Sequence, residues 1–125
     1  MENSMFGVII KVNDLDNCRI FYRDVLNLGE PLLDSSFVVQ FALAENLNLT
    51  LEKNQGTFLE HASSATNWFF ECDDIAALSK KLQDSGFPGL FDTITFGSSL
   101  YYKGRDPENN VFYVRQKKNK FHRHT

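Results

Sequence analysis

Apolar residues follow two different periods along the first part of the chain. Residues 5–12 are mostly apolar and rich in strand-forming types, which predicts a strand. Asp14 then supplies a helix N-cap, and the helix that follows is expected to end near Asn27 and Gly29 and not to resume at Pro31. Its apolar side chains recur three or four residues apart: Leu15, Cys18, Phe21, Tyr22, Val25 and Leu26.

A hairpin comes next, and then the pattern begins again. Residues 37–43 and 47–53 read as two strands joined by a turn at Glu45 and Asn46, and 54–66 reads as a connecting loop. A second helix carries Ile75, Leu78 and Leu82, starts at Asp73 or Asp74 and closes at Gly86. The remaining predicted strands are 68–72, 90–96, 100–103 and 111–116.

The two halves of the chain match at an offset of 60 residues. Val12-Asn13-Asp14-Leu15 aligns with Cys72-Asp73-Asp74-Ile75, and the same offset brings Cys18 onto Leu78 and Tyr22 onto Leu82. Half a sheet with one helix cannot bury both faces, whereas two such halves can. The sequence therefore predicts a single α+β domain over 1–125. Module one spans about 5–54 and module two about 66–117, each β-α-β-β, or β-α-β-β-β if the short segments pair.

Composition indicates a globular protein, with 42% hydrophobic and 14% aromatic residues. Some of the twelve Phe rings can line a cavity instead of a core. We expect no membrane segment and no signal peptide, because no long apolar run is present and residues 1–4 lack a basic region. Cys18 and Cys72 are interpreted as reduced, buried thiols of a cytoplasmic protein.

Charge is distributed unevenly along the chain. The formal net charge is −3, all sixteen acidic residues precede Arg115, and the tail at 118–125 is basic. An acidic body repels phosphate backbones, so nucleic acid is excluded as a partner and the tail is interpreted as a solvated terminus.

Four segments resemble the vicinal oxygen chelate superfamily, which includes glyoxalase I, extradiol dioxygenases and bleomycin-resistance proteins. Residues 9–15 and 21–26 resemble its opening strand and helix, and 70–75 resembles the start of its second module. Residues 106–112 are similar to its Asp-Pro-Asp-Gly-Asn turn. Asn109 stands in place of the glycine, and Asn is the residue that best tolerates the same left-handed backbone. The resemblance implies two βαβββ modules that form a curled mixed sheet, a half-open barrel with helices outside and a cavity inside.

The metal ligands of that superfamily are not kept. The resemblance places its four ligand positions at Gly7, Thr50, Asn67 and Tyr113, with Glu52 close enough to be used if the register shifts. A transition metal needs about three or four imidazole, thiolate or carboxylate ligands. We therefore expect no metal and no cofactor, which removes metal-dependent isomerisation, dioxygenation and thiol transfer.

Strand alternation, combined with the resemblance, predicts which side chains line the cavity. One of Tyr101 and Tyr102 is expected to reach it, because neighbouring strand residues point to opposite faces. Phe69 and Tyr113 can instead be plain core residues, and Lys11 and Glu71 can form a structural ion pair. The candidate ligand-binding residues are Gly7, Ile9, Lys11, Thr50, Glu52, Asn67, Phe69, Glu71, Tyr101, Tyr113 and Arg115.

The function predicted from these features is metal-free binding of a small organic molecule, such as a drug or an aromatic metabolite, by a homodimer. The rival hypothesis is an enzyme of the same fold, with a divergent metal site at Glu52 or acid–base chemistry by Tyr113, Lys11 or Glu71. A third is a structural or regulatory interaction module. The sequence contains no nucleophile elbow and no phosphate loop, and its histidines, His61, His122 and His124, are scattered.

Overall fold

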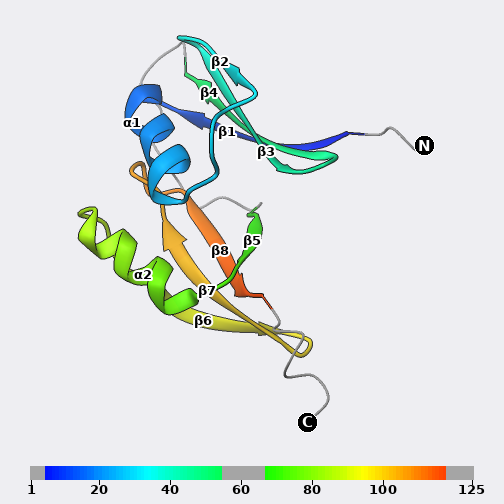
Figure 1. Ribbon diagram of the computed structural model, residues 1–125, viewed down its shortest axis with the longest axis vertical. Helices are drawn as coiled ribbons and strands as arrows, with labels where there is room; N and C mark the ends of the chain where they lie inside the picture. Colours follow the sequence, from blue (N-terminus) through cyan, green and yellow to red (C-terminus); the bar gives the residue numbers. More distant parts are fainter. Residues whose placement is uncertain (1–4, 55–66, 118–125) are drawn as a thin grey trace. The chain divides into compact units, whose positions relative to one another are not determined.

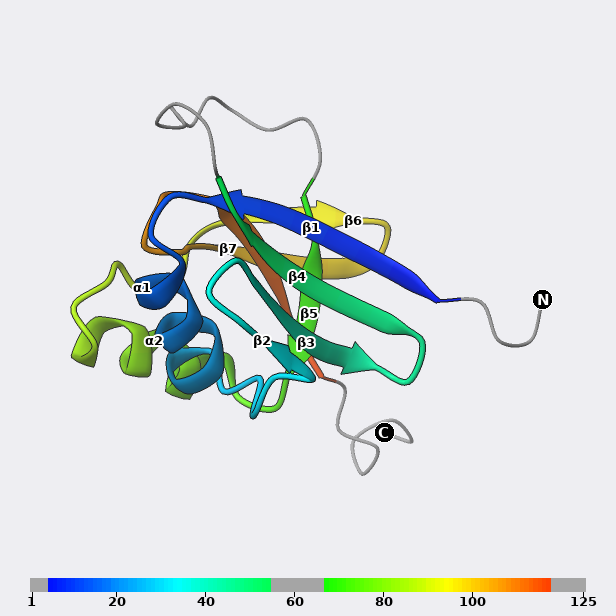
Figure 2. The ribbon, with the colours of Figure 1, turned by 90° about the horizontal axis from the view of Figure 1, so that it is seen from above.

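The computed structural model describes residues 5–54 and 67–117 of the chain. These residues form two compact units, the first made of 5–54 with the turn 106–110, the second of 67–105 with 111–117. Each unit has one four-stranded mixed sheet and one helical segment (Figures 1 and 2). The predicted α+β class with two βαβββ modules is therefore confirmed. The predicted loop at 55–66 and the tail at 118–125 lie outside the described residues.

The first unit follows the order β-α-β-β-β. Its sheet has the strand order β1-β4-β3-β2, in which β1 runs parallel to β4 and the other neighbours are antiparallel. The Asp14 side chain accepts a hydrogen bond from the Asn17 amide at 3.0 Å, which confirms it as the N-cap of α1. The elements are β1 (Phe6–Val12), α1 (Leu15–Ile20), η1 (Phe21–Val25), β2 (Leu33–Asp34), β3 (Val38–Ala44) and β4 (Leu47–Lys53).

The second half of the first helical segment differs from the regular helix that the sequence predicts. From Phe21 to Val25 it is a π-helix, and the Leu26 amide donates to the Phe21 carbonyl five residues back. All six apolar residues predicted for this helix are buried.

The core of the first unit lies between α1–η1 and one face of its sheet. Val39 and Phe41 of β3 and Leu49 and Leu51 of β4 are fully buried, and the rings of Tyr22 and Phe41 lie 6.5 Å apart. The predicted βαβββ order includes the strand β2, but its range could not be predicted, because two residues are too few to show an alternating pattern.

The second unit repeats this topology. Its sheet has the order β5-β8-β7-β6, with β5 parallel to β8 and the other pairs antiparallel. Asp74 accepts from the Ala77 amide at 3.1 Å to start α2, and Gly86 follows the helix with φ +90°. The elements are β5 (Phe69–Cys72), α2 (Ile75–Asp84), β6 (Phe91–Phe96), β7 (Ser99–Arg105) and β8 (Val111–Gln116).

Aromatic rings fill the helix side of the second sheet. The rings of Trp68, Phe70 and Phe112 contact one another, with centroids 5.5 to 6.0 Å apart, and Leu82 of α2 is fully buried. A Cβ atom at Gly104 would lie 2.4 Å from the Phe112 ring, so the close approach of β7 and β8 needs glycine there. In the described parts of the chain, no helix is long and apolar enough to cross a membrane.

Candidate functional site

Each sheet has a helix-free face, the side turned away from its own unit's helix. Strand alternation places the sequence-predicted residues of both modules on these faces. Asn67 is exposed and lies just before β5, two residues from Phe69. The two faces are composed differently.

The helix-free face of the first sheet is small and polar. Thr50 lies between Ile9 and Gln40 in the register, and the Gln40 side-chain amide donates to its hydroxyl at 3.2 Å. Ile9 itself is 66% exposed. Gly7 lies opposite Asn48 on β4.

Lys11 and Glu71 each form an ion pair within their own unit. The Lys11 ammonium lies 3.7 Å from the carboxylate of Glu52, directly opposite on β4, and Glu71 pairs with Arg115, directly opposite on β8. Parallel neighbours at matched register supply the closer partner in both sheets.

On the second sheet, the guanidinium of Arg115 organises the helix-free face. Its Nε and Nη2 donate to one oxygen of Glu71 at 2.9 and 2.5 Å, and its Nη1 donates to the Tyr101 hydroxyl at 3.2 Å. The hydrogen bond that Arg115 donates to the Glu71 carboxylate raises the pKa of Arg115. The flat guanidinium lies 5.2 Å from the Phe69 ring centroid and 5.7 Å from that of Tyr101, within cation–π distance of both.

Of Tyr101 and Tyr102, the structure places Tyr101 on the helix-free face of the second sheet. Tyr101 lies opposite Arg115 and meets Phe69 edge-to-face at 5.2 Å, whereas Tyr102 lies opposite Val114, on the helix side. Tyr101 is buried beneath its neighbours, and Phe69 remains 46% exposed. A ligand would therefore meet Phe69 first.

Three further residues belong to this face and were missed by the sequence prediction. Lys103 lies opposite both Tyr113 on β8 and Phe91 on β6, with its ammonium 6.0 Å from the Tyr113 ring centroid. The Arg105 guanidinium lies 5.2 Å from the Phe91 ring centroid. Once Tyr101 is assigned to the face, alternation along β7 assigns Lys103 and Arg105 as well.

We call this surface the aromatic–cationic face. In the described part of the chain, no carboxylate lies within ion-pair distance of Lys103 or Arg105, so the face carries three cations and one carboxylate. Such a surface can stack a planar ring and attract negative charge. Its members are Phe69, Glu71, Phe91, Tyr101, Lys103, Arg105, Tyr113 and Arg115.

The residues at the superfamily's ligand positions do not fit a transition metal. Gly7 has no donor atom in its side chain, a neutral Tyr113 is a poor metal ligand, and the carboxylate of Glu52 is paired with Lys11. Over residues 5–54 and 67–117, no three His, Cys, Asp or Glu side chains come together as metal ligands would.

The turn 106–110 has a structural role within the first unit. The Tyr22 hydroxyl donates to buried Asp106 at 2.8 Å, and the Glu108 carboxylate accepts from the Asn13 and Asp14 amides at 2.8 and 2.6 Å. Asn109 has φ +67°, the left-handed backbone expected of it. Burial, reinforced by these carboxylates, raises the pKa of Tyr22 and of nearby Cys18 well above their ordinary values, so neither group is a ready nucleophile.

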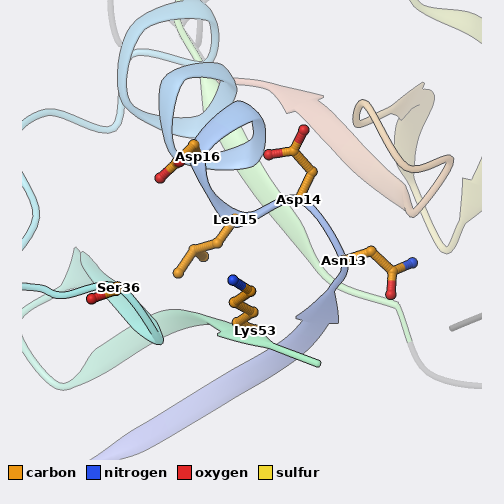
Figure 3. A pocket seen from close by; sticks show the side chains of 6 residues that line it. All are labelled: Asn13, Asp14, Leu15, Asp16, Ser36 and Lys53. Atoms are coloured by element: carbon orange, nitrogen blue, oxygen red, sulfur yellow. The ribbon is translucent and has the colours of Figure 1, made fainter. Parts of the chain in front are cut away.

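A polar pocket opens beside the start of α1, with a volume of about 230 Å³ (Figure 3). The Lys53 side chain extends toward Leu15 within it. Asp14 is engaged as the helix cap, and Asp16 pairs with Arg19 at 2.6 Å. The pocket offers no ring for stacking, which makes the aromatic–cationic face the better candidate site. The residues that line the pocket are Asn13, Asp14, Leu15, Asp16, Ser36 and Lys53.

Comparison with known proteins assigns the fold. No protein-family model matches the sequence, and no curated protein matches it. Among solved structures, a lactoylglutathione lyase from Agrobacterium tumefaciens is similar, with TM-score 0.65 and 20% identity over 90% of this chain and 92% of that one. A glyoxylase/bleomycin resistance protein/dioxygenase domain from Frankia sp. EAN1pec has TM-score 0.66 and 18% identity over 90% and 95%.

A third similar structure is an integron cassette protein from the mobile metagenome of a Halifax Harbour sewage outfall. Its TM-score is 0.68 at 18% identity, over 91% of this chain and 98% of that one. The chain therefore has the fold of the glyoxalase, bleomycin-resistance and dioxygenase proteins, as the sequence resemblance implied.

Proposed function

We propose that this chain is a metal-free small-molecule-binding protein of the glyoxalase and bleomycin-resistance type. Its ligand, a drug or an aromatic metabolite, is held on the aromatic–cationic face. The observation that carries the proposal is the group of Phe69, Tyr101 and Arg115, in which a fixed guanidinium and a buried ring hold a half-exposed ring in place. A preorganised ring loses little freedom when it stacks on a ligand.

The energetics of such a face are sufficient without a metal. Burial of apolar ligand surface contributes about 25 cal/mol per Å², and an aromatic contact adds roughly 0.5–1.5 kcal/mol. After the cost of immobilising the ligand, a planar molecule of two fused rings can reach micromolar affinity.

Titration with planar two-ring probes tests the proposal. We expect 2-naphthol, 2-naphthoate or 2-naphthylmethylammonium to bind, and Tyr113→Ala to weaken binding several-fold. Thr50→Ala is the matched control, because Thr50 holds the corresponding register position in the first sheet and has no ring. If no probe binds the wild-type protein, or if the two variants bind alike, the proposal fails.

The enzyme hypothesis has no comparable support. Of the residues it would use, Lys11 and Glu71 are held in cross-strand ion pairs, and the Lys103 ammonium lies 6.0 Å from the Tyr113 ring centroid.

We also propose that the protein works as a homodimer. β1 is an edge strand, and the apolar side chains of Phe6 and Ile9 on it are 62% and 66% exposed, which favours a covering partner. Native mass spectrometry should show two chains and no metal. A monomer at micromolar concentration would refute the dimer, and one zinc, nickel, iron or manganese per chain would refute metal-free binding.

A further inference from the structure

The aromatic–cationic face carries more positive than negative charge among the described residues. Arg115 donates from three nitrogens to Glu71 and Tyr101, so its positive charge has a carboxylate partner. Lys103 and Arg105 contact rings, at 6.0 and 5.2 Å, and within the described chain they have no carboxylate partner. Two positive charges are thus available beside the rings.

Lys103 stands in the middle of a row that crosses all four strands. In the register Phe69 lies opposite Tyr113, Tyr113 opposite Lys103, and Lys103 opposite Phe91. Neighbouring strands lie about 4.8 Å apart, so the ammonium is one strand from the nearest ring on either side. A planar ligand stacked on Tyr113 would bring a substituent on its edge within reach of Lys103.

We infer that the ligand of this face is an aromatic carboxylate, with its ring on Phe69 and Tyr113 and its carboxylate on Lys103. This inference rests on the proposed function and narrows the class of ligand. Charge complementarity carries it, since an anion completes a surface that has three cations and one carboxylate. A charge-assisted hydrogen bond is about twice as strong as a neutral one and adds specificity for the carboxylate.

Lys103 is a specificity-determining residue in this scheme, and Arg115 is a positioning residue. The guanidinium of Arg115 fixes Phe69 and Tyr101 but has its hydrogen-bonding nitrogens engaged. Arg105 lies two residues from Lys103 on the same face and adds positive potential, which salt partly screens.

The test compares 2-naphthoate with its neutral isostere 2-naphthamide. We expect the carboxylate to bind wild-type protein about tenfold more tightly than the amide at low salt. Lys103→Gln should bring this ratio close to one, because carboxylate binding should weaken far more than amide binding. Lys11→Gln is the matched control, because it removes one positive charge from the first sheet, and it should leave the ratio as in wild type.

The outcomes separate the two proposals. If 2-naphthamide binds wild type as tightly as 2-naphthoate, or if Lys103→Gln keeps the tenfold ratio, the inference about the carboxylate is refuted while aromatic binding stands. If neither compound binds and 2-naphthol also fails, the proposed function itself is refuted.

Discussion

The two sheets share strand order and register, but their helix-free faces carry different side chains. Where the first sheet has an aliphatic, a hydroxyl and an amide side chain in one row, the second has two rings and an ammonium. The row Ile9, Thr50 and Gln40 corresponds to the row Phe69, Tyr113 and Lys103. The second sheet therefore carries the aromatic side chains on which the proposed binding depends.

Both faces carry a cross-strand ion pair, but the cation and the anion exchange strands between the two sheets. Lys11 on β1 pairs with Glu52 on β4, and Glu71 on β5 pairs with Arg115 on β8, at corresponding positions of the two sheets. A cross-strand ion pair at this position is thus a property of the module. The second module replaces the flexible ammonium by a planar guanidinium, which can also stack on rings.

The largest expected effect separates the two faces of the second sheet. Phe112 is fully buried against Phe70 and Gly104, so Phe112→Ala should lower the free energy of unfolding by about 3–5 kcal/mol. Tyr113→Ala, one residue along the same strand, should cost much less because its ring is only half buried. Urea denaturation measures both. Equal losses would show that the aromatic–cationic face is core and not a binding surface.

The fold could be predicted from the sequence because its signals are local and repeated. Asp14 and Asp74 cap helices through amides three residues on, and Gly86 ends α2 in the left-handed conformation it was expected to need. These effects depend on short stretches of chain. The same reasoning missed the π-helical turn at Phe21, which no local pattern indicates.

The site could be predicted only in part, because it depends on register. Strand alternation predicts that Tyr101 and Tyr102 point to opposite faces of the sheet. It does not predict which of the two lies on the helix-free face. That choice follows from pairing with Arg115 across strands, and the β6–β7 ladder has an irregularity at Asp92, where φ is +34°. The missed residues Lys103 and Arg105 depend on the same choice.

Alkaline pH should weaken the first unit before the second. At the helix positions where the second unit has Leu78 and Leu82, the first has Cys18 and Tyr22, both buried with raised pKa values. A raised pKa keeps the neutral form in the folded state. Unfolded chains therefore ionise first, and the stabilisation is lost as pH rises above the ordinary thiol value of 9.0.

We expect Cys18 to reduce the free energy of unfolding by about 1.4 kcal/mol for each pH unit above 9. Urea denaturation at pH 8, 9, 10 and 11 under reducing conditions measures the slope. Cys18→Ala should be less stable at pH 8 but should show a shallower decline, leaving the parts due to Tyr22 and to Cys72, whose partial burial also raises its pKa. Parallel declines for the variant and the wild type would contradict the assignment.

The smallest expected effects compare the two ion pairs. Both are substantially exposed, so Lys11→Gln and Glu71→Gln should each change the melting temperature by no more than a few degrees. Binding should distinguish them, because Glu71 holds the guanidinium that organises Phe69 and Tyr101, whereas Lys11 organises no ring.

Glu71→Gln should therefore weaken the binding of 2-naphthol by about twofold. Arg115 loses its charged partner, and its guanidinium then holds the rings of Phe69 and Tyr101 less firmly. The substitution should at the same time raise the preference for 2-naphthoate over 2-naphthol, because the face gains one unit of net positive charge. Lys11→Gln should change neither quantity. If both variants alter binding equally, or if the preference for the carboxylate falls in Glu71→Gln, the two ion pairs play the same role and the contrast between the two faces does not determine ligand choice.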